Sequence, residues 1–203
     1  MEKQVDYTAY NFSSYCHKKR WMSYWHQLDE VYKIDPKNIL IVGTGDGIVQ
    51  RILSKSIDVK ILDIAEDLYP DILGSVTDLS RLTNERFDCI LCSQVLEHIP
   101  FGQFEKCLKE LSICTRKYCV ISLPQFRWAL GIDFTLNRTL GFQFVFPRKN
   151  VTYSFDGQHY WNIGVKGCSR NDIEKLIQKY FYIEHSFDVK EITFHRFYVL
   201  KKK

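Results

Sequence analysis

The chain has 203 residues, of which 45% are hydrophobic, 15% aromatic and 26% charged. This length suits one domain, the apolar fraction excludes wholesale disorder, and ten glycines with five prolines exclude collagen-like and low-complexity proteins. A net charge of +4 is too small to indicate a nucleic-acid-binding protein by itself, and no apolar run is long enough for a transmembrane span.

The N-terminal part, residues 1–37, is predicted to form a helical cap. Between residues 13 and 33 the pattern is helical, and an aromatic and aliphatic stripe repeats at i, i+3, i+4 and i+7 on one helix face. This stripe consists of Trp21, Tyr24, Trp25 and Leu28. Such a stripe favours packing against the core, and the alternative is that part of it closes over a ligand.

Residues 38–123 alternate strand and helix signals and are predicted to form the ligand-binding core. Short apolar strands are expected at 38–43, 59–63, 87–92 and 118–123, with helices at 48–54 and 101–115. Strands that alternate with helices in this way predict βαβ units and a parallel sheet.

The cysteines of this part are interpreted as structural. Cys89 and Cys92 have the spacing of a metal or redox pair, but residues three apart on a strand point to opposite faces of the sheet. Cys107 and Cys114 are expected on one buried helix stripe. Seven cysteines without a recognisable signal peptide predict a reducing, cytoplasmic location.

The remaining chain is predicted to hold an insertion at 124–167, acting as a lid, and a C-terminal helix and strand pair at 168–203. The helix is expected at 170–180, with Ser169 or Asn171 as its N-cap. Two strands follow at 181–187 and 194–200. The predicted fold class is therefore α/β, a single Rossmann-like domain. It has a seven-stranded, mostly parallel sheet whose last strand is antiparallel, with helices on both faces.

A glycine cluster, Gly43-Thr-Gly-Asp-Gly47, directly follows the first strand and opens a helix. Glycines there permit a tight turn and a close approach of backbone to ligand, and Asp63 ends the next strand, where a carboxylate accepts hydrogen bonds from a ribose diol. Position 48 is isoleucine, where the dinucleotide fingerprint needs a small residue, and no Walker pattern is present. The spacing favours a nucleoside ligand without a pyrophosphate, such as S-adenosylmethionine, over the cofactor of an NAD-dependent oxidoreductase.

Together these motifs resemble those of class I S-adenosylmethionine-dependent methyltransferases, of the small-molecule type that includes quinone-biosynthesis enzymes. Residues 39–47, 60–63 and 87–100 resemble the first, second and fourth motifs of the family, and 118–124 resemble its fifth strand. The Val-Leu-Glu-His sequence that ends at His98 is the most specific part. The resemblance implies S-adenosylmethionine as cofactor and transfer of its methyl group to a small or medium-sized acceptor.

The resemblance also implies a set of cofactor-binding residues. They are Gly43, Thr44, Gly45, Gly47, Asp63, Ile64, Ser75, Val76 and Ser93. Ser75 is a departure, because family members often carry at this position an aspartate that binds the adenine amino group, and Asp78 lies three residues further on. This departure motivates the alternative of a non-catalytic, S-adenosylmethionine-binding or regulatory protein with the same fold.

Methyl transfer from a sulfonium needs positioning, and it needs a base only where the acceptor must lose a proton. His98 and His159 are the candidate bases, with a structural role as the alternative for each. Tyr160 and Trp161 are predicted to line the substrate pocket. No cluster with metal-ligand spacing is apparent in the sequence, so no metal is predicted.

The segment 124–170 carries six basic and two acidic side chains. The basic ones are Arg127, Arg138, Arg148, Lys149, Lys166 and Arg170. They favour an acceptor that bears phosphate or carboxylate, with an ordinary solvated surface as the equal alternative. An RNA methyltransferase is less favoured because the overall charge is small, and an alternating apolar run at 128–136 leaves a membrane-surface role open. The sequence does not predict an oligomeric state.

Overall fold

A computed structural model describes residues 8, 10–13, 15–135, 139–147 and 151–203 of the chain. Of the strand residues between 128 and 147 it gives the backbone course and only the Phe146 side chain. Arg138, Arg148, Lys149 and the side chains of the apolar run at 128–136 therefore lie outside the described residues. None of the described helices has the length and apolar character needed to cross a membrane.

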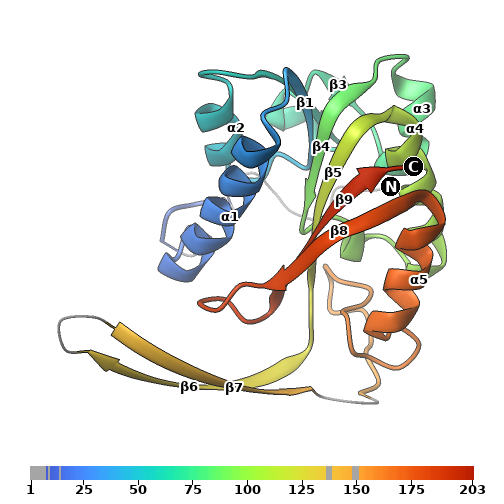
Figure 1. The fold of residues 1–203 in the computed structure, drawn as a ribbon. Coiled ribbons are helices and arrows are strands. Elements are labelled where there is room, and N and C mark those ends of the chain that lie inside the picture. Colours follow the sequence, from blue (N-terminus) through green and yellow to red (C-terminus); the bar gives the residue numbers. More distant parts are fainter. Residues whose placement is uncertain (1–7, 9, 14, 136–138, 148–150) are drawn as a thin grey trace.

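The centre is a seven-stranded sheet with strand order β3-β2-β1-β4-β5-β9-β8 (Figure 1). Its strands are β1 (Asn38–Val42), β2 (Asp58–Asp63), β3 (Ile72–Leu73), β4 (Phe87–Ser93), β5 (Thr115–Pro124), β8 (Phe181–Asp188) and β9 (His195–Lys202). The first five are parallel to one another, whereas β9 runs antiparallel to both of its neighbours. The predicted fold class is confirmed, including the antiparallel last strand.

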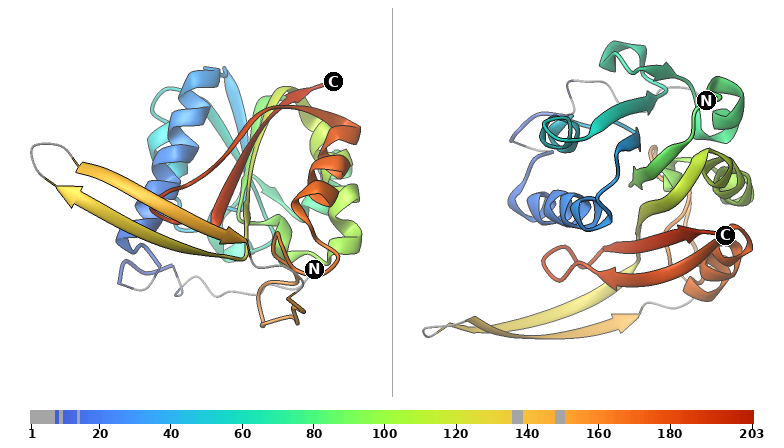
Figure 2. Two further views of the ribbon diagram at one scale, coloured as in Figure 1. Left: turned by 60° about the horizontal axis from the view of Figure 1, so that its bottom comes forward. Right: turned by 45° about the horizontal axis from the view of Figure 1, so that its top comes forward.

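Helices cover both faces of the sheet (Figures 1 and 2). On one face lie α1 (Lys18–Ile34) and α2 (Ile48–Leu53), and on the other lie α3 (Leu79–Leu82), α4 (Phe104–Cys114) and α5 (Arg170–Tyr180). Short 3₁₀ helices lie in the connections: η2 (Glu66–Leu68), η3 (Val76–Asp78), η4 (Leu96–His98) and η5 (Phe101–Gln103).

Each strand supplies side chains to both cores. On β1, Ile39 and Ile41 belong to the core under α1 and α2, whereas Leu40 and Val42 belong to the core under α4 and α5. All four are at most 5% exposed, so each contributes about 1.5–3 kcal/mol of burial free energy. This two-sided burial explains why the sequence of β1 is an unbroken apolar run.

The interpretation of the cysteines is confirmed. Cys89 and Cys92 are buried in the cores on opposite faces of β4, and Cys107 and Cys114 are buried on one side of α4. All seven cysteines of the chain are free thiols. Complete burial raises the pKa of the Cys89 and Cys92 thiols well above the usual range, so neither is a thiolate at neutral pH.

The buried face of α1 differs from the stripe that the aromatic spacing predicts. Tyr24 is buried, but Trp21 and Trp25 are 39% and 56% exposed. Instead of the two tryptophans, polar side chains of α1 are buried against the sheet, because they have hydrogen-bonding partners on its strands. Ser23 is buried with its Oγ 2.9 Å from Nδ1 of His195 on β9.

Helix α5 begins with the predicted N-cap. The Ser169 hydroxyl accepts a hydrogen bond from the Asp172 backbone N–H at 3.2 Å, and the Asp172 carboxylate accepts from the Ser169 backbone N–H at 3.3 Å. These two reciprocal bonds form a capping box, which satisfies donors that the first helical turn leaves without partners.

Ser169→Ala is expected to lower the free energy of unfolding by about 1 kcal/mol, because it removes this cap. Chemical denaturation compared with wild type measures the change. Asn171→Ala serves as the control, because Asn171 lies two residues further along and is not part of the capping box. Equal stability of Ser169→Ala and wild type would show that the cap is not needed.

The insertion contains a hairpin of β6 (Arg127–Thr135) and β7 (Thr139–Pro147), which extends away from the central sheet (Figures 1 and 2). The chain then returns toward the sheet, where Gln125 and Ile163 form a parallel bridge. Of the described residues in this insertion, Gln158 and His159 reach the ligand cavity described below. The hairpin strands were not predicted as a pair, and the lid role of the insertion stays a prediction.

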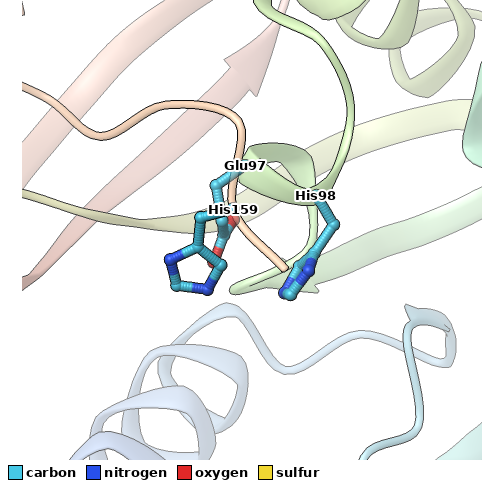
Figure 3. Close-up of side chains that lie close together, drawn as sticks. All are labelled: Glu97, His98 and His159. Carbon is cyan, nitrogen blue, oxygen red and sulfur yellow. The ribbon is translucent and has the colours of Figure 1, made fainter. Parts of the chain in front are cut away.

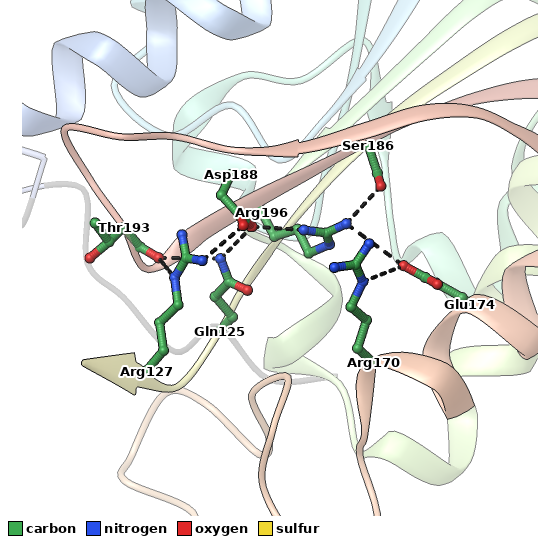
Figure 4. Close-up of polar contacts among 8 residues, drawn as sticks. All are labelled: Gln125, Arg127, Arg170, Glu174, Ser186, Asp188, Thr193 and Arg196. Atoms are coloured by element: carbon green, nitrogen blue, oxygen red, sulfur yellow. Dashed lines mark hydrogen bonds and ion pairs between the residues drawn. The ribbon is translucent and has the colours of Figure 1, made fainter. Parts of the chain in front are cut away.

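A polar network at the base of the hairpin ties it to β8 and β9 (Figure 4). One Asp188 carboxylate oxygen accepts from Arg127 at 2.8 Å, and the other accepts from Arg196 at 2.8 Å and from Gln125 at 2.7 Å. The Arg127 and Arg196 side chains are only 10% and 3% exposed. Arg170 pairs instead with Glu174 on its own helix, at 2.7 Å. Arg127 and Arg170 are thus engaged in structural ion pairs.

Candidate functional site

A cavity of about 320 Å³ opens at the carboxyl ends of β1, β2 and β4. Because β1 lies between β2 and β4 in the sheet, this is the crevice at which open α/β sheets bind ligands. The volume is in the range of small-molecule sites. Tyr10, Tyr15 and Arg20 from the N-terminal segment line the cavity, and so do Gln158 and His159 from the insertion.

The turn after β1 brings bare backbone to the cavity wall. Gly43 and Gly45 both line it, with φ angles of +80° and +55° that favour glycine. A Cβ atom added to Gly43 would lie 2.6 Å from Cγ2 of Val95, which is closer than side chains approach in proteins. The glycine at position 43 is therefore required both by its conformation and by its neighbour.

Gly43→Ala is expected to lower the free energy of unfolding by about 1–3 kcal/mol, because it adds a Cβ at a positive φ against Val95. Thermal or chemical unfolding measures the loss. Gly102→Ala is the matched control, since Gly102 has an ordinary φ and open space around its Cα. Similar losses in both variants would contradict the role of the tight turn.

Asp63 ends β2 at the wall of the cavity and orders the loops around it. Its carboxylate accepts hydrogen bonds from the backbone N–H groups of Thr44 at 2.8 Å and Ala65 at 2.9 Å. These bonds fix the direction of the carboxylate, and each oxygen keeps a further lone pair for a ligand hydroxyl.

At another part of the wall, Glu97, His98 and His159 lie close together (Figure 3). One ligand atom from each lies within 4.8 Å of the others. Burial raises the pKa of the Glu97 carboxyl to about 8, lowers the pKa of His98 to about 4, and also lowers the pKa of His159. The imidazoles are therefore neutral at neutral pH.

Comparison with known proteins indicates which domain the core forms. Residues 40–121, from β1 through β5, match the family model for a methyltransferase domain. This part of the chain is a methyltransferase domain. No curated protein sequence matches the chain.

Solved structures similar to this methyltransferase span nearly all of it. N-methyltransferase NodS from Bradyrhizobium japonicum, in complex with S-adenosylhomocysteine, has 10% identity and a TM-score of 0.63, covering 97% of each chain. The 1,6-didemethyltoxoflavin-N1-methyltransferase of Burkholderia thailandensis has 13% identity and a TM-score of 0.62, covering 100% of this chain and 92% of its own. An S-adenosylmethionine-dependent methyltransferase from Clostridium acetobutylicum has 12% identity, a TM-score of 0.60 and 92% coverage of each chain. At these identities the likeness shows the fold.

Most of the cofactor-binding residues predicted for the methyltransferase line its cavity. They are Gly43, Gly45, Asp63, Ile64, Val76 and Ser93. Thr44 instead lines a smaller adjoining hollow of about 50 Å³. Two predicted positions are not in the wall, for local reasons. Gly47 is the N-cap of α2, and the Ser75 hydroxyl caps η3 by accepting from the Thr77 backbone N–H at 3.2 Å.

The two predicted substrate-pocket residues also lie elsewhere. Trp161 is 2% exposed and packs in the core of the methyltransferase, with both Phe101 and Phe104 at 5.1 Å between ring centroids. Its Nε1–H donates to the Ile99 carbonyl at 2.9 Å. Tyr160 stacks on a neighbouring aromatic ring outside the cavity wall. The prediction that Trp161 contacts the substrate is therefore wrong, because its side chain packs in the core.

Sequence reasoning missed several residues of the cavity wall. They are Tyr10, Tyr15, Arg20, Gln94 and His195, together with Glu97 in its role as a site residue. Arg20 is a cation within the wall, and its guanidinium lies 3.9 Å from the Tyr15 ring centroid. The match to the fourth motif offered a signal for Gln94 and Glu97, whereas Tyr10, Tyr15, Arg20 and His195 reach the cavity through tertiary folding.

His195 of the methyltransferase gives its stability a dependence on pH. Burial, with help from the Arg20 charge, lowers the pKa of His195 to about 3, against an ordinary value of 6.5. The native state thus favours the neutral imidazole. The resulting stability is complete above about pH 6.5 and is lost as the pH falls from there toward 3.

His195→Gln is expected to lose less stability between pH 6 and pH 4 than wild type. The difference in slope approaches about 1.4 kcal/mol per pH unit, the value for one proton. Denaturation at a series of pH values measures both slopes. His185→Gln, at a half-exposed histidine on β8, is the control. Parallel pH profiles for wild type and His195→Gln would contradict the assignment.

Proposed function

We propose that the enzyme transfers the methyl group of S-adenosylmethionine to a small or medium-sized acceptor that binds beside Glu97, His98 and His159. The observation that carries this proposal is the single cavity that joins Asp63 at one part of its wall to this polar cluster at another. A cavity of about 320 Å³ supports a small acceptor rather than a polymer.

The cofactor half of the cavity is assigned by its chemistry. Gly43 and Gly45 let the backbone approach the amino-acid part of the cofactor, and Asp63 accepts hydrogen bonds from the ribose hydroxyls. Ile64 and Val76 provide apolar surface for the adenine. Because Ser75 is engaged as a cap and the Asp78 carboxylate pairs with Lys106 at 3.0 Å, the adenine amino group is expected to meet backbone groups instead.

Arg20 is the side chain of the cavity wall that is best suited to bind an anionic group, on the cofactor or on the acceptor. Its guanidinium faces the cavity, and its Nε has no hydrogen-bond partner among the described residues. The preference for an acceptor with a carboxylate or phosphate group therefore rests on Arg20. Of the basic side chains in the insertion and the helix after it, Arg127 and Arg170 are engaged in ion pairs. A continuous basic surface for RNA is not part of the proposal.

His98 or His159 serves as the base when the acceptor must lose a proton. The His98 Nδ1 lies 3.0 Å from the Gln158 carbonyl oxygen, so Nδ1 carries the hydrogen and Nε2 carries the lone pair. Burial lowers the pKa of both imidazoles, so each is neutral with a free lone pair at neutral pH but is a weaker base than an exposed histidine. A cytoplasmic location fits the seven free thiols.

The proposal is tested first by cofactor binding and then by turnover. S-adenosylhomocysteine should raise the melting temperature and NAD(H) should not, because only a ligand of the native state stabilises it. S-adenosylmethionine is then incubated with a panel of small amines, phenols and carboxylic acids, and S-adenosylhomocysteine is measured by mass spectrometry. Acceptor-dependent product supports the enzyme. Binding without any turnover across the panel, or turnover only with RNA, would overturn the assigned acceptor class.

A further inference from the structure

The Glu97 side chain is completely buried, and neither carboxylate oxygen has a hydrogen-bond partner among the described residues. A buried carboxyl group, charged or neutral, is costly unless it is hydrogen-bonded, and native proteins satisfy nearly all such groups. An unsatisfied pair of oxygens therefore indicates a bound species at this position. Because Glu97 belongs to the cavity wall, that species can enter through the cavity.

Two imidazoles stand beside this carboxylate. The His98 and His159 rings meet edge to face with their centroids 4.8 Å apart, and a ligand atom of each lies within 4.8 Å of a Glu97 oxygen (Figure 3). Imidazole nitrogens and carboxylate oxygens bind transition-metal ions at about 2.0–2.2 Å, which places neighbouring ligand atoms roughly 3–3.5 Å apart. The three groups must therefore draw closer together when an ion binds.

The surroundings hold these groups as they are held in metal sites. The His98 Nδ1–H donates to the Gln158 carbonyl at 3.0 Å, which leaves the lone pair on Nε2 for an ion. The backbone of His159 donates to the Asp156 carboxylate at 2.7 Å, and the Tyr153 hydroxyl donates to the same carboxylate at 2.5 Å. The His98 ring is thus oriented by a second group, and the backbone of His159 is held in place, as the outer shell of a metal site requires.

We propose that Glu97, His98 and His159 bind one divalent transition-metal ion in the acceptor half of the cavity. Two histidines and one carboxylate form a ligand set that suits Zn²⁺, Co²⁺ or Mn²⁺ and leaves coordination positions open. The open positions face the cavity, where an oxygen or nitrogen of the acceptor can coordinate. Ion binding itself does not depend on the proposed function, whereas this role toward the acceptor rests on it.

The ion also changes the roles assigned to the two histidines. Coordination uses the imidazole lone pair, so a histidine that binds the ion does not act as the base. Arg20 is the competing partner for Glu97, because its Nε likewise lacks a hydrogen-bond partner among the described residues. The two explanations differ in whether the purified protein takes up a metal ion.

The test is titration of the chelator-treated full chain with Co²⁺ alone, followed by calorimetry and by visible absorption. One Co²⁺ per chain is expected, with a visible absorption band of the bound ion. His159→Ala and Glu97→Gln should each weaken binding at least about 10-fold. His185→Ala is the matched control, because His185 pairs with Glu30 away from the cavity, and it should bind as wild type does.

Stabilisation by S-adenosylhomocysteine is measured on every variant, which reports folding and the cofactor site separately. Should a variant fail to fold, NMR of the imidazole nitrogens in the wild type tests the proposal instead. Addition of Zn²⁺ should then change the chemical shifts of two histidine rings, those of His98 and His159. The proposal is overturned if wild type binds no stoichiometric Co²⁺, if the cavity variants bind like wild type, or if Zn²⁺ shifts other histidines. S-adenosylhomocysteine binding without Co²⁺ binding rejects the metal site alone.

Discussion

Asp63→Ala is expected to abolish the thermal stabilisation that S-adenosylhomocysteine gives the wild-type enzyme. The proposed role of Asp63 is to accept two hydrogen bonds from the ribose, and a hydrogen bond to a charged group is worth about 1.5–3 kcal/mol. Loss of both lowers the affinity by roughly 100-fold or more. The substitution also removes the acceptor for the Thr44 and Ala65 backbone N–H groups, so the loops around the cofactor lose their anchor.

Glu66→Ala is the matched control, since Glu66 is an exposed carboxylate only three residues further along. The melting temperature of each protein is measured with and without S-adenosylhomocysteine. The control should keep the full shift. A full shift in Asp63→Ala would show that the ribose binds elsewhere and would refute the assignment of the cofactor half of the cavity.

The second large effect is expected from Asp188→Ala, which should lower the free energy of unfolding by about 3–5 kcal/mol. Asp188 accepts from Arg127 and Arg196, two guanidinium groups that are almost fully buried (Figure 4). Removing the shared carboxylate leaves Arg127 without a carboxylate partner among the described residues and takes from Arg196 its shorter ion pair, in a poorly solvated place. Arg196 keeps a hydrogen bond to Ser186 at 2.7 Å and a longer ion pair with Glu174 at 3.7 Å.

Urea denaturation measures the loss, and Glu105→Gln is the control. Glu105 pairs with Lys179 at 2.9 Å, but both side chains are well exposed, so this pair contributes at most about 1 kcal/mol. A loss of the same size in both variants would contradict the view that burial, and not the mere presence of an ion pair, makes the Asp188 network important.

Local patterns were sufficient for most of the sheet. The apolar run of β1 and the alternation of strand and helix signals predicted the parallel order, because buried parallel strands must be apolar on both faces. The N-cap at Ser169 was also predictable from the local sequence, because its capping partner lies only three residues away.

Patterns failed where the decisive partner is distant in the sequence. Glu30 of α1 is buried because His185 of β8 lies 3.0 Å from it, and Ser23 is buried against His195. No local periodicity signals such pairs, so only half of the predicted stripe packs against the core: Tyr24 and Leu28 do, and Trp21 and Trp25 do not. The prediction for Trp161 failed for the same reason, because its core partners, Phe101 and Phe104, lie on η5 and α4, far from it in the sequence.

The same limit applies to the candidate site. Gly43 and Asp63 were recognisable because a short βα unit fixes their relation. Glu97 and His98 meet His159 only through the return of the insertion, where the Tyr160 backbone N–H donates to the Glu97 carbonyl at 2.8 Å. The sequence therefore predicted no metal site, while the fold gathers three candidate ligands.

A crystal structure of the enzyme with S-adenosylhomocysteine tests the central claim most directly. The account predicts that both ribose hydroxyls lie within hydrogen-bond distance of the Asp63 carboxylate. It also predicts that the sulfur faces the part of the cavity formed by Glu97, His98 and His159. A ribose bound away from Asp63, or a sulfur turned away from that cluster, would contradict the account.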